Sequence, residues 1–296
     1  MRVHNVGYRF ATAEPVASGL SRIALEQVDR ALGEIADPQL SAAVTVHEVR
    51  KRCKKLRGLL RLARPALGRT YQRENRAIRN AARLLSTTRD AAVAVAAFDA
   101  LVGDSAEEFS PDAVAALRAA LAGANHAAES PAGEPLEQFR QHMLELRNRI
   151  PAWRMRGKAE RAVARGFAEQ HRLARQAMHV AFDDPTPERL HEWRKGVKYH
   201  GYHLRLVVRV WPRGVKPWIG AATKLGETLG EDHDLAVLAV RVVDAGRQAD
   251  QATAAARLVE LAEAARAQRQ AVAREVGKRL FAFRSRDMER WLARLW

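Results

Sequence analysis

A 16-residue segment occurs twice in the chain, and this repeat restricts the folds that the sequence can adopt. HEVRKRCKKLRGLLRL begins at His47, and HEWRKGVKYHGYHLRL begins 144 residues later, at His191. The same offset aligns LLSTTRDAAV, from Leu84, with TLGEDHDLAV, from Thr228. Because two successive segments keep one register, we infer a duplicated unit rather than a chance similarity of Ala- and Leu-rich helices.

Apolar residues recur at helical spacing along the chain, and runs of alternating β-branched residues are absent. The sequence therefore predicts an all-α fold, with joints rich in Gly, Pro, Asp and Ser. The expected helices are 15–36, 40–64, 69–102, 111–129, 134–149, 153–182, 187–210, 215–245, 250–283 and 286–295. Together with the repeat, they predict two similar bundles, the first over residues 1–130 and the second over residues 131–296.

Each copy of the repeated segment predicts an amphipathic helix whose apolar stripe faces a bundle core. At 100° per residue, the stripe of the first copy is Val46, Val49, Cys53, Leu56, Leu60 and Ala63. The stripe of the second copy is Leu190, Trp193, Val197, His200, Leu204, Val207 and Trp211. We expect Cys53 to be a small core residue and His200 to be a hydrogen-bonded one.

A line of cations runs beside each apolar stripe. The first basic stripe is His47, Arg50, Lys51, Lys54, Arg57 and Arg61, and the second is His191, Arg194, Lys195, Lys198 and Arg205. The next helix of each half adds cations that can share a face, namely Arg73, Arg76 and Arg83 in the first half and Lys224 in the second. Like charges four residues apart on a helix repel, so we predict a polyanion that neutralises these stripes. The alternative is a solvated basic surface.

The composition supports a polyanionic partner without choosing one. The 296 residues carry a net charge of +16, which suits nucleic acid, anionic lipid or a phosphate polymer. No apolar run reaches the ~20 residues of a membrane span, and no secretory signal is evident at the start. The single cysteine excludes an internal disulfide and fits a reducing cytoplasm.

The repeated histidines, His47 and His191, allow several interpretations. Neither lies in a cluster with metal-ligand spacing, so we expect no metal and no cofactor. Glu48 and Glu192 follow them directly, but neighbours on a helix point about 100° apart, which disfavours a catalytic pair. We expect each histidine to begin its basic stripe by donating to phosphate or orienting a neighbour. Two repeated aspartates on the next helix, Asp90 and Asp234, either pair with these groups or form plain interhelical salt bridges.

The pattern H-E-x-R-K-x-x-K, followed by L-R-L and then by L-x-x-x-x-D-x-x-V on the next helix, resembles the CHAD domain, the conserved histidine α-helical domain. The opening EPVASGLSRIALEQVDRALGEIADP is also similar, so the resemblance covers about residues 13–296. It implies two pseudo-symmetric four-helix bundles around a basic central groove or pore. It further implies binding of inorganic polyphosphate by both basic stripes, targeting to polyphosphate granules, and no enzymatic activity.

The chain departs from a perfect repeat in ways that bear on function. Gly201 and Tyr202 stand where the first half has Arg57 and Gly58, so we expect weaker binding in the second half. His233 likewise replaces Arg89. No E-x-E-x-K strand of a CYTH domain occurs, so we expect a stand-alone CHAD domain without triphosphate hydrolysis.

Other functions fit the residues less well. A nucleic-acid-binding protein would interleave aromatic residues with the cations, yet aromatic residues are 6% of the chain and the first stripe contains none. A phosphatase would need a carboxylate cluster or a phosphate loop, and GETLGEDHD lacks the P-loop spacing. A membrane-surface protein would need a free apolar face. The sequence identifies no protein partner. The C-terminal RDMERWLARLW either closes the second bundle or forms a dimer contact.

Overall fold

The computed structural model describes residues 7–85, 90–123 and 133–295, and for residues 90–92 and 106 it describes the backbone alone. Every regular element in these ranges is helical, which confirms the all-α prediction. The elements up to residue 123 are α1 (Val16–Ala36), α2 (Ala42–Leu67), α3 (Arg69–Arg83), α4 (Asp90–Gly103), η1 (Ala106–Glu108) and α5 (Pro111–Gly123). The others are α6 (Gly133–Arg149), η3 (Ile150–Ala152), α7 (Ala159–Asp183), α8 (Pro187–Val207), α9 (Pro212–Gln248), α10 (Ala252–Leu280) and α11 (Ser285–Leu295).

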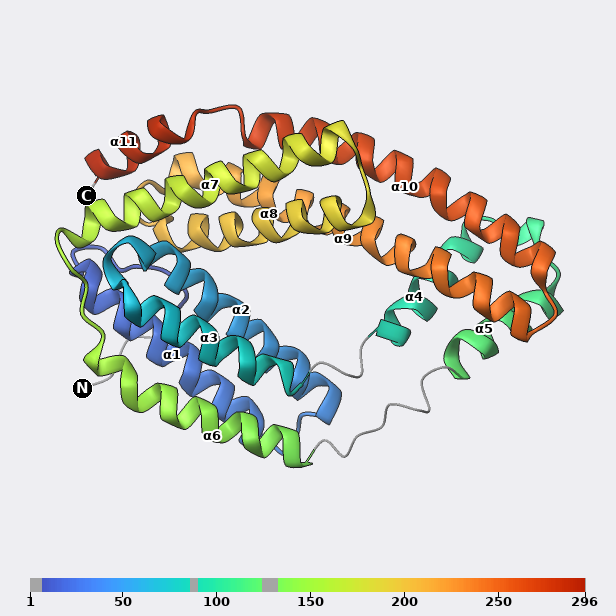
Figure 1. The fold of residues 1–296 in the computed structure, drawn as a ribbon, viewed down its shortest axis with the longest axis horizontal. Helices are drawn as coiled ribbons and strands as arrows, with labels where there is room; N and C mark the ends of the chain where they lie inside the picture. Colours follow the sequence, from blue (N-terminus) through green and yellow to red (C-terminus); the bar gives the residue numbers. More distant parts are fainter. Residues whose placement is uncertain (1–6, 86–89, 124–132, 296) are drawn as a thin grey trace.

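The four helices α1, α2, α3 and α6 form a first bundle, low in Figure 1. Helix α2 packs against α1 and α3, and α6 closes the group by packing against the same two helices. Helix α6 begins after residue 131, so the sequence placed it in the second bundle, but it packs in the first. The packing of the helices therefore crosses the expected boundary between residues 130 and 131.

Helices α7, α8, α9 and α11 form a second bundle, above the first in Figure 1. Helix α8 packs against α7 and α9, α11 packs against α7, and α10 pairs with α9. Met288 and Leu292 of α11 are buried. The C-terminal helix therefore closes this bundle, which was one of the two predicted alternatives.

A separate group lies at the right end of Figure 1, where α4 and α5 pack against the distal part of α9, and α4 also contacts α10. Its core is formed by residues such as Phe98, Leu117, Leu238 and Leu258 and is distinct from the main core. The first half of the chain thus supplies helices to a group that is built on α9 and α10. In the described ranges, no helix is long and apolar enough to cross a membrane.

The two bundles share one continuous core, which runs from Leu56 and Leu60 of α2 to Phe167 of α7 and Trp193 of α8. The contact between α2 and α7 is very close at Gly166. A Cβ atom there would lie 1.9 Å from the carbonyl oxygen of Leu62, so only glycine fits. Because both bundles depend on this core, they form one packed unit rather than two independent domains.

Short local signals set the limits of the two repeated helices. Ser41 caps α2 by accepting from the amide of Val44 at 3.4 Å, and Thr186 caps α8 by accepting from the amide of Arg189 at 3.3 Å. Helix α2 ends at Leu67 and is followed by Gly68, whose φ of 51° is readily adopted by glycine. The predicted end was residue 64, but the helix continues through Pro65 for three more residues, to Leu67.

Two other predicted features differ from the structure. The expected helix 69–102 is described as α3 and α4, and residues 86–89 between them lie outside the described ranges. Trp211 was expected in the core but is 42% exposed. Helix α8 ends at Val207, so the helical phase that placed Trp211 inward no longer applies.

Candidate functional site

The repeated helix α2 buries its apolar stripe as predicted. Val49, Cys53, Leu56, Leu60 and Ala63 are at most 2% exposed, and Val46 is partly buried. Burial raises the pKa of the Cys53 thiol to about 12, which makes it an unreactive core residue. On the adjoining face, His47 and Lys54 are exposed, whereas the other members of the first basic stripe are half-buried.

Neutral groups on α3 and the segment after it hold two arginines of the first stripe in place. Arg50 Nη1 donates to the backbone oxygen of Leu85 at 2.7 Å, and Arg57 Nε donates to Asn75 Oδ1 at 3.0 Å. Each bond uses one of the five guanidinium N–H donors and adds no negative charge. These contacts therefore orient the arginines without neutralising them.

Three further cations of α2 form ion pairs with acidic side chains that the sequence analysis did not predict. Arg52 pairs with Glu34 of α1 at 2.5 Å, and Lys51 pairs with Glu48 at 2.7 Å. Arg64 pairs with Glu169 of α7 at 3.2 Å. The cations of α2 between residues 50 and 64 therefore repel one another less than the sequence suggested, because two of these acids come from other helices.

The second basic stripe, on α8, packs against α9. A Cβ atom on Gly230 would lie 2.8 Å from the Arg194 guanidinium, and one on Gly226 would lie 3.7 Å from Lys198 Cγ. Arg205 Nη2 donates to Thr223 Oγ1 at 2.8 Å. Lys195 forms an ion pair with Glu192 at 2.5 Å, as Lys51 does with Glu48.

Helices α2 and α8 cross where the two basic stripes approach each other. A Cβ atom on Gly58 would lie 3.2 Å from Tyr202 Cβ, and His203 Nε2 donates to the Gly58 carbonyl at 2.9 Å. The Arg61 guanidinium of the first stripe lies 4.3 Å from the ring centroid of Tyr199, on the second helix. The crossing therefore brings the C-terminal ends of the two stripes to one region.

A model of the CHAD domain family matches residues 22–243, which is more than half of the sequence. The chain belongs to the CHAD family. The crystal structure of the CHAD domain from the plant Ricinus communis is similar over 95% of both chains, with a TM-score of 0.62 and 19% sequence identity. At this identity the likeness concerns the fold alone. No curated protein matches the sequence.

The matched span of the CHAD chain contains both basic stripes, but their histidines lie in different settings. The rings of His191 and His233 are 4.7 Å apart, centroid to centroid. Burial, followed by His233, lowers the pKa of His191, and its Nδ1 has no hydrogen-bond partner among the described residues. His47 is more exposed and lies 4.0 Å from Glu48.

Of the two repeated aspartates, only Asp234 has a described side chain. Asp234 Oδ1 lies 3.6 Å from His233 Nδ1, so it contacts the partner of His191 rather than His191 itself. The side chain of Asp90 and all of Arg89 lie outside the described residues. Among the described side chains, no three His, Cys, Asp or Glu groups are arranged to hold a metal ion.

The cations of α3 do not all lie on the face that meets α2. Asn75 marks that face because it contacts Arg57. At 100° per residue, Arg83 and Arg76 lie about 80° and 100° from Asn75, and Arg73 lies about 160° away. Arg73 pairs instead with buried Glu74, at 2.7 Å. Lys224, on α9, is exposed one residue from the Thr223 that holds Arg205.

Two cations were left out of the predicted site, Arg79 on α3 and Lys55 on α2. Arg79 lies only about 40° from Asn75 on α3, closer than the arginines that were predicted. Lys55 lies 5.5 Å from the Tyr8 ring centroid, and the Tyr8 hydroxyl donates to the Lys55 carbonyl at 2.7 Å. Burial lowers the pKa of Lys55 to about 8, with further lowering from nearby cations that include Arg205 of α8. The 144-residue offset aligns Arg79 with Thr223, the residue that holds Arg205, and this correspondence was a signal for Arg79 in the sequence.

Proposed function

We propose that this CHAD chain binds inorganic polyphosphate through the basic faces of α2 and α8, as a module that attaches to polyphosphate granules and does not hydrolyse the polymer. The observation that carries the proposal is the crossing of the two repeated helices at Gly58 and Tyr202. His47 and His191 each precede their crossing residue by eleven positions (58 − 47 and 202 − 191), or ~16 Å of helix. We propose that a flexible polyanion follows one stripe to the crossing and continues along the other.

The way in which the arginines are held supports binding to an anion. Arg50, Arg57 and Arg205 are fixed by a carbonyl, an amide and a hydroxyl, all of them neutral groups. Their positive charge is therefore available to phosphate oxygens, for which the guanidinium fork is well suited. Because the side chains are already oriented, less conformational entropy is lost on binding.

The mechanism is multivalent neutralisation of charge. Each bound phosphate releases condensed counterions, so affinity falls as salt concentration rises. Each further phosphate of the same chain binds as an intramolecular contact, so affinity rises with polymer length until the stripes are filled.

Single-stranded nucleic acid is the alternative polyanion, and the setting of the tyrosines disfavours it. Bases would need aromatic faces on which to stack. The Tyr199 ring already has the Arg61 guanidinium beside it, and Tyr202 packs against Gly58. A polymer of phosphate alone needs no stacking face.

The test compares fluorescent long-chain polyphosphate with single-stranded DNA of matched charge, over a series of salt concentrations. Two variants remove stripe lysines, Lys51→Ala/Lys54→Ala and Lys195→Ala/Lys198→Ala. The control, Lys158→Ala/Lys278→Ala, removes two exposed lysines outside the stripes, and Lys278 has an i,i+3 ion pair like those of Lys51 and Lys195. We expect a preference for polyphosphate and a salt slope that falls by about 0.7 per stripe lysine removed.

Equal affinity for both polymers, or equal effects of the stripe and control variants, would show that the stripes are only a solvated basic surface. Release of orthophosphate from bound polymer, measured on the same samples, would contradict binding without hydrolysis.

A further inference from the structure

Four aromatic side chains form a cluster where α11 and the loop before it meet the start of α9. The ring centroid of Trp291 lies 5.2 Å from that of Trp211 and 5.7 Å from that of Trp218, and Trp218 lies 5.8 Å from Phe283. Trp211 is 42% exposed and Phe283 is 52% exposed. None of these residues belongs to either basic stripe, and large exposed apolar side chains that gather on one surface often mark a binding site.

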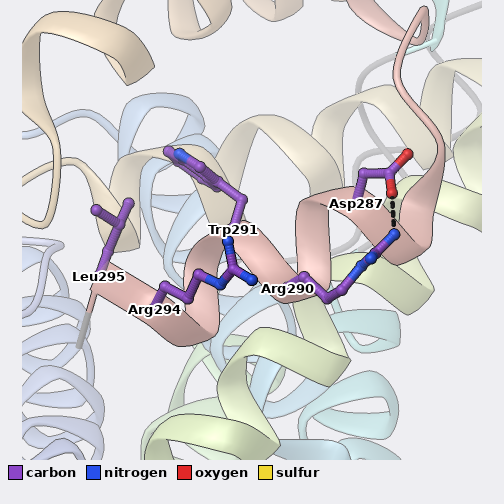
Figure 2. Close-up of a pocket in the computed structure, with 5 residues that line it drawn as sticks. All are labelled: Asp287, Arg290, Trp291, Arg294 and Leu295. Atoms are coloured by element: carbon purple, nitrogen blue, oxygen red, sulfur yellow. Dashed lines mark hydrogen bonds and ion pairs between the residues drawn. The ribbon is translucent and has the colours of Figure 1, made fainter.

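A depression of ≈ 450 Å³ lies beside this cluster and is lined by residues of α11. Figure 2 shows the side chains of Asp287, Arg290, Trp291, Arg294 and Leu295, with the Asp287–Arg290 ion pair near one end and Leu295 at the other. Trp291 belongs to both the cluster and the depression. Trp and Arg are the residues that most often dominate binding energy at protein interfaces.

The exposed position of Trp211 is built into the backbone. A Cβ atom on Gly214 would lie 2.2 Å from the Trp211 ring, so the indole rests directly on the glycine in the first turn of α9. On α11, Met288 and Leu292 are buried, whereas Leu295 is 39% exposed. The helix thus uses one set of apolar residues to close the bundle and keeps Leu295 at the surface.

The depression is lined by Arg290 and Arg294, and the segments that carry the cluster are rich in cations. Residues 209–218 and 278–295 contain nine Lys or Arg and only two acidic residues. One of those acids, Asp287, is paired with Arg290 at 2.6 Å. An apolar surface with this rim is complementary to a ligand that combines carboxylates with a large apolar group.

We propose that this surface docks an acidic segment of a partner protein that carries a large apolar side chain. The apolar side chain occupies the depression beside Trp291 and Leu295, and the flanking carboxylates pair with Arg290 and Arg294. This interaction is independent of polyphosphate binding, because it uses none of the stripe residues. It gives the chain a surface for a protein in addition to its surface for a polymer.

Three other occupants fit the same surface less well. A second copy of the chain would bring two basic surfaces together. A single-stranded nucleic acid needs separate stacking faces, but these rings contact one another at 57° to 67° and form one apolar patch. A membrane-bound helix would insert its apolar face, yet Met288 and Leu292 of α11 are already buried.

The test measures the binding of fluorescent peptides of equal length to the full chain, with excess polyphosphate present to occupy the stripes. One peptide set places Phe, Trp or Leu at each position of a Glu- and Asp-rich background. The matched sets replace the apolar residue with Ser, or the acidic background with Lys. We expect binding by acidic peptides that carry an apolar residue, with affinity at least about tenfold lower for both matched sets.

The variants locate the binding site. We expect Arg290→Glu/Arg294→Glu to weaken peptide binding about tenfold or more and Leu295→Ser to weaken it less. The control is Arg247→Glu on α9, because Arg247 is exposed and pairs with Asp244 three residues earlier, as Arg290 pairs with Asp287. It should leave peptide affinity unchanged.

Several results would overturn the proposal. The first is that no acidic peptide with a large apolar residue binds. The second is that the Ser-substituted set binds with equal affinity. The third is that Arg247→Glu lowers peptide affinity as much as Arg290→Glu/Arg294→Glu does. Single-stranded DNA or anionic vesicles that bind through Arg290 and Arg294 while the peptides do not would assign the surface to a different ligand.

Discussion

The backbone of Gly58 packs against the side chain of Tyr202, and these two residues are separated by the same 144 positions that separate the two copies of the repeat. The surroundings of these two residues also correspond through the repeat. The Arg61 guanidinium lies beside the Tyr199 ring, and the charge of Arg205, the counterpart of Arg61, helps to lower the pKa of Lys55, the counterpart of Tyr199. Each repeated helix therefore places an arginine whose charge acts on the other helix.

Enlarging Gly58 should push the two repeated helices apart. A Cβ atom there would lie 3.1 Å from the Tyr8 hydroxyl and 3.2 Å from Tyr202 Cβ, and the methyl groups of valine would approach further. We expect Gly58→Val to lower the free energy of unfolding by about 1–3 kcal/mol through overpacking. It should also weaken polyphosphate binding, because the stripes separate.

Gly33→Val is the matched control, measured by urea denaturation alongside Gly58→Val. Gly33 is also helical, and a Cβ atom there would meet nothing within 4 Å. The two substitutions therefore share their effect on helix propensity and differ in packing. Equal stability of the two variants would mean that the crossing is loosely packed.

Three buried histidines should make the fold sensitive to mild acid. Burial lowers the pKa of His171 to about 4, that of His203 to about 3, and that of His200 well below its usual value. Between pH 6.5 and about 4 the unfolded chain therefore binds protons that the folded chain does not. The stability that these residues give is complete above about pH 7 and declines as pH falls, by up to about 1.4 kcal/mol per histidine per pH unit.

Urea denaturation between pH 7 and pH 5 tests this expectation before most carboxylates titrate. His171→Phe keeps a ring next to Phe281 and should reduce the pH slope by about a third, since one of the three histidines is removed. A free energy of unfolding that stays constant between pH 7 and pH 5 would show that these histidines bind protons in the folded chain.

Lys55 should react as an amine at a lower pH than a lysine in an unfolded peptide. Burial is the main cause of its lowered pKa of about 8, and Arg52 adds to the effect. Acetylation followed by peptide mapping should give a pH midpoint near 8 for Lys55, whereas a lysine in an unfolded reference peptide titrates at about 10.4. Since midpoints are compared, a difference in access to the reagent does not affect the result. A Lys55 midpoint near 10 would contradict the burial of its amine and the additional effect of the nearby cations.

Polyphosphate binding should be linked to proton uptake at His191. Burial and the neighbouring His233 lower its pKa in the unbound chain, and a bound phosphate favours the protonated ring. Affinity should therefore increase as pH falls, because bound phosphate raises the pKa of the His191 imidazole above its lowered value in the unbound chain. Titration calorimetry in buffers of different ionisation enthalpy measures the protons bound.

The His191→Gln variant should lose most of this proton uptake, whereas His179→Gln, at an exposed histidine of α7, should retain it. Proton uptake that is the same in both variants would assign the linkage to another group.

The helices and their buried faces followed from the sequence because both depend on local periodicity. Val49, Cys53 and Leu56 could be placed in the core from their spacing alone, and the structure confirms them. The members of the two basic stripes on α2 and α8 could be chosen in the same way. Their roles as polyphosphate ligands stay predictions until binding is measured.

Features that depend on packing between distant segments were not predictable. Spacing could not show that α6 joins the first bundle or that Glu34 neutralises Arg52. It also could not show that Gly230, which has no Cβ atom, leaves room for the Arg194 guanidinium, because a glycine in a helix gives no signal about its neighbours. Trp211 was misplaced for a related reason, since the end of α8 changed the phase on which the prediction relied.

Helix α9 gives the molecule a mechanical property that a chain of linked domains lacks. It is continuous from Pro212 to Gln248, or ~55 Å. Gly226 and Gly230, beneath the second basic stripe, lie near the middle of the helix, and its C-terminal part carries the core on which α4 and α5 rest. Domains joined by flexible linkers swing freely, but a group built on an unbroken helix moves only if the helix bends or tilts as a whole. A displacement of α9 at the second basic stripe would therefore also move the C-terminal part of the helix, together with α4 and α5.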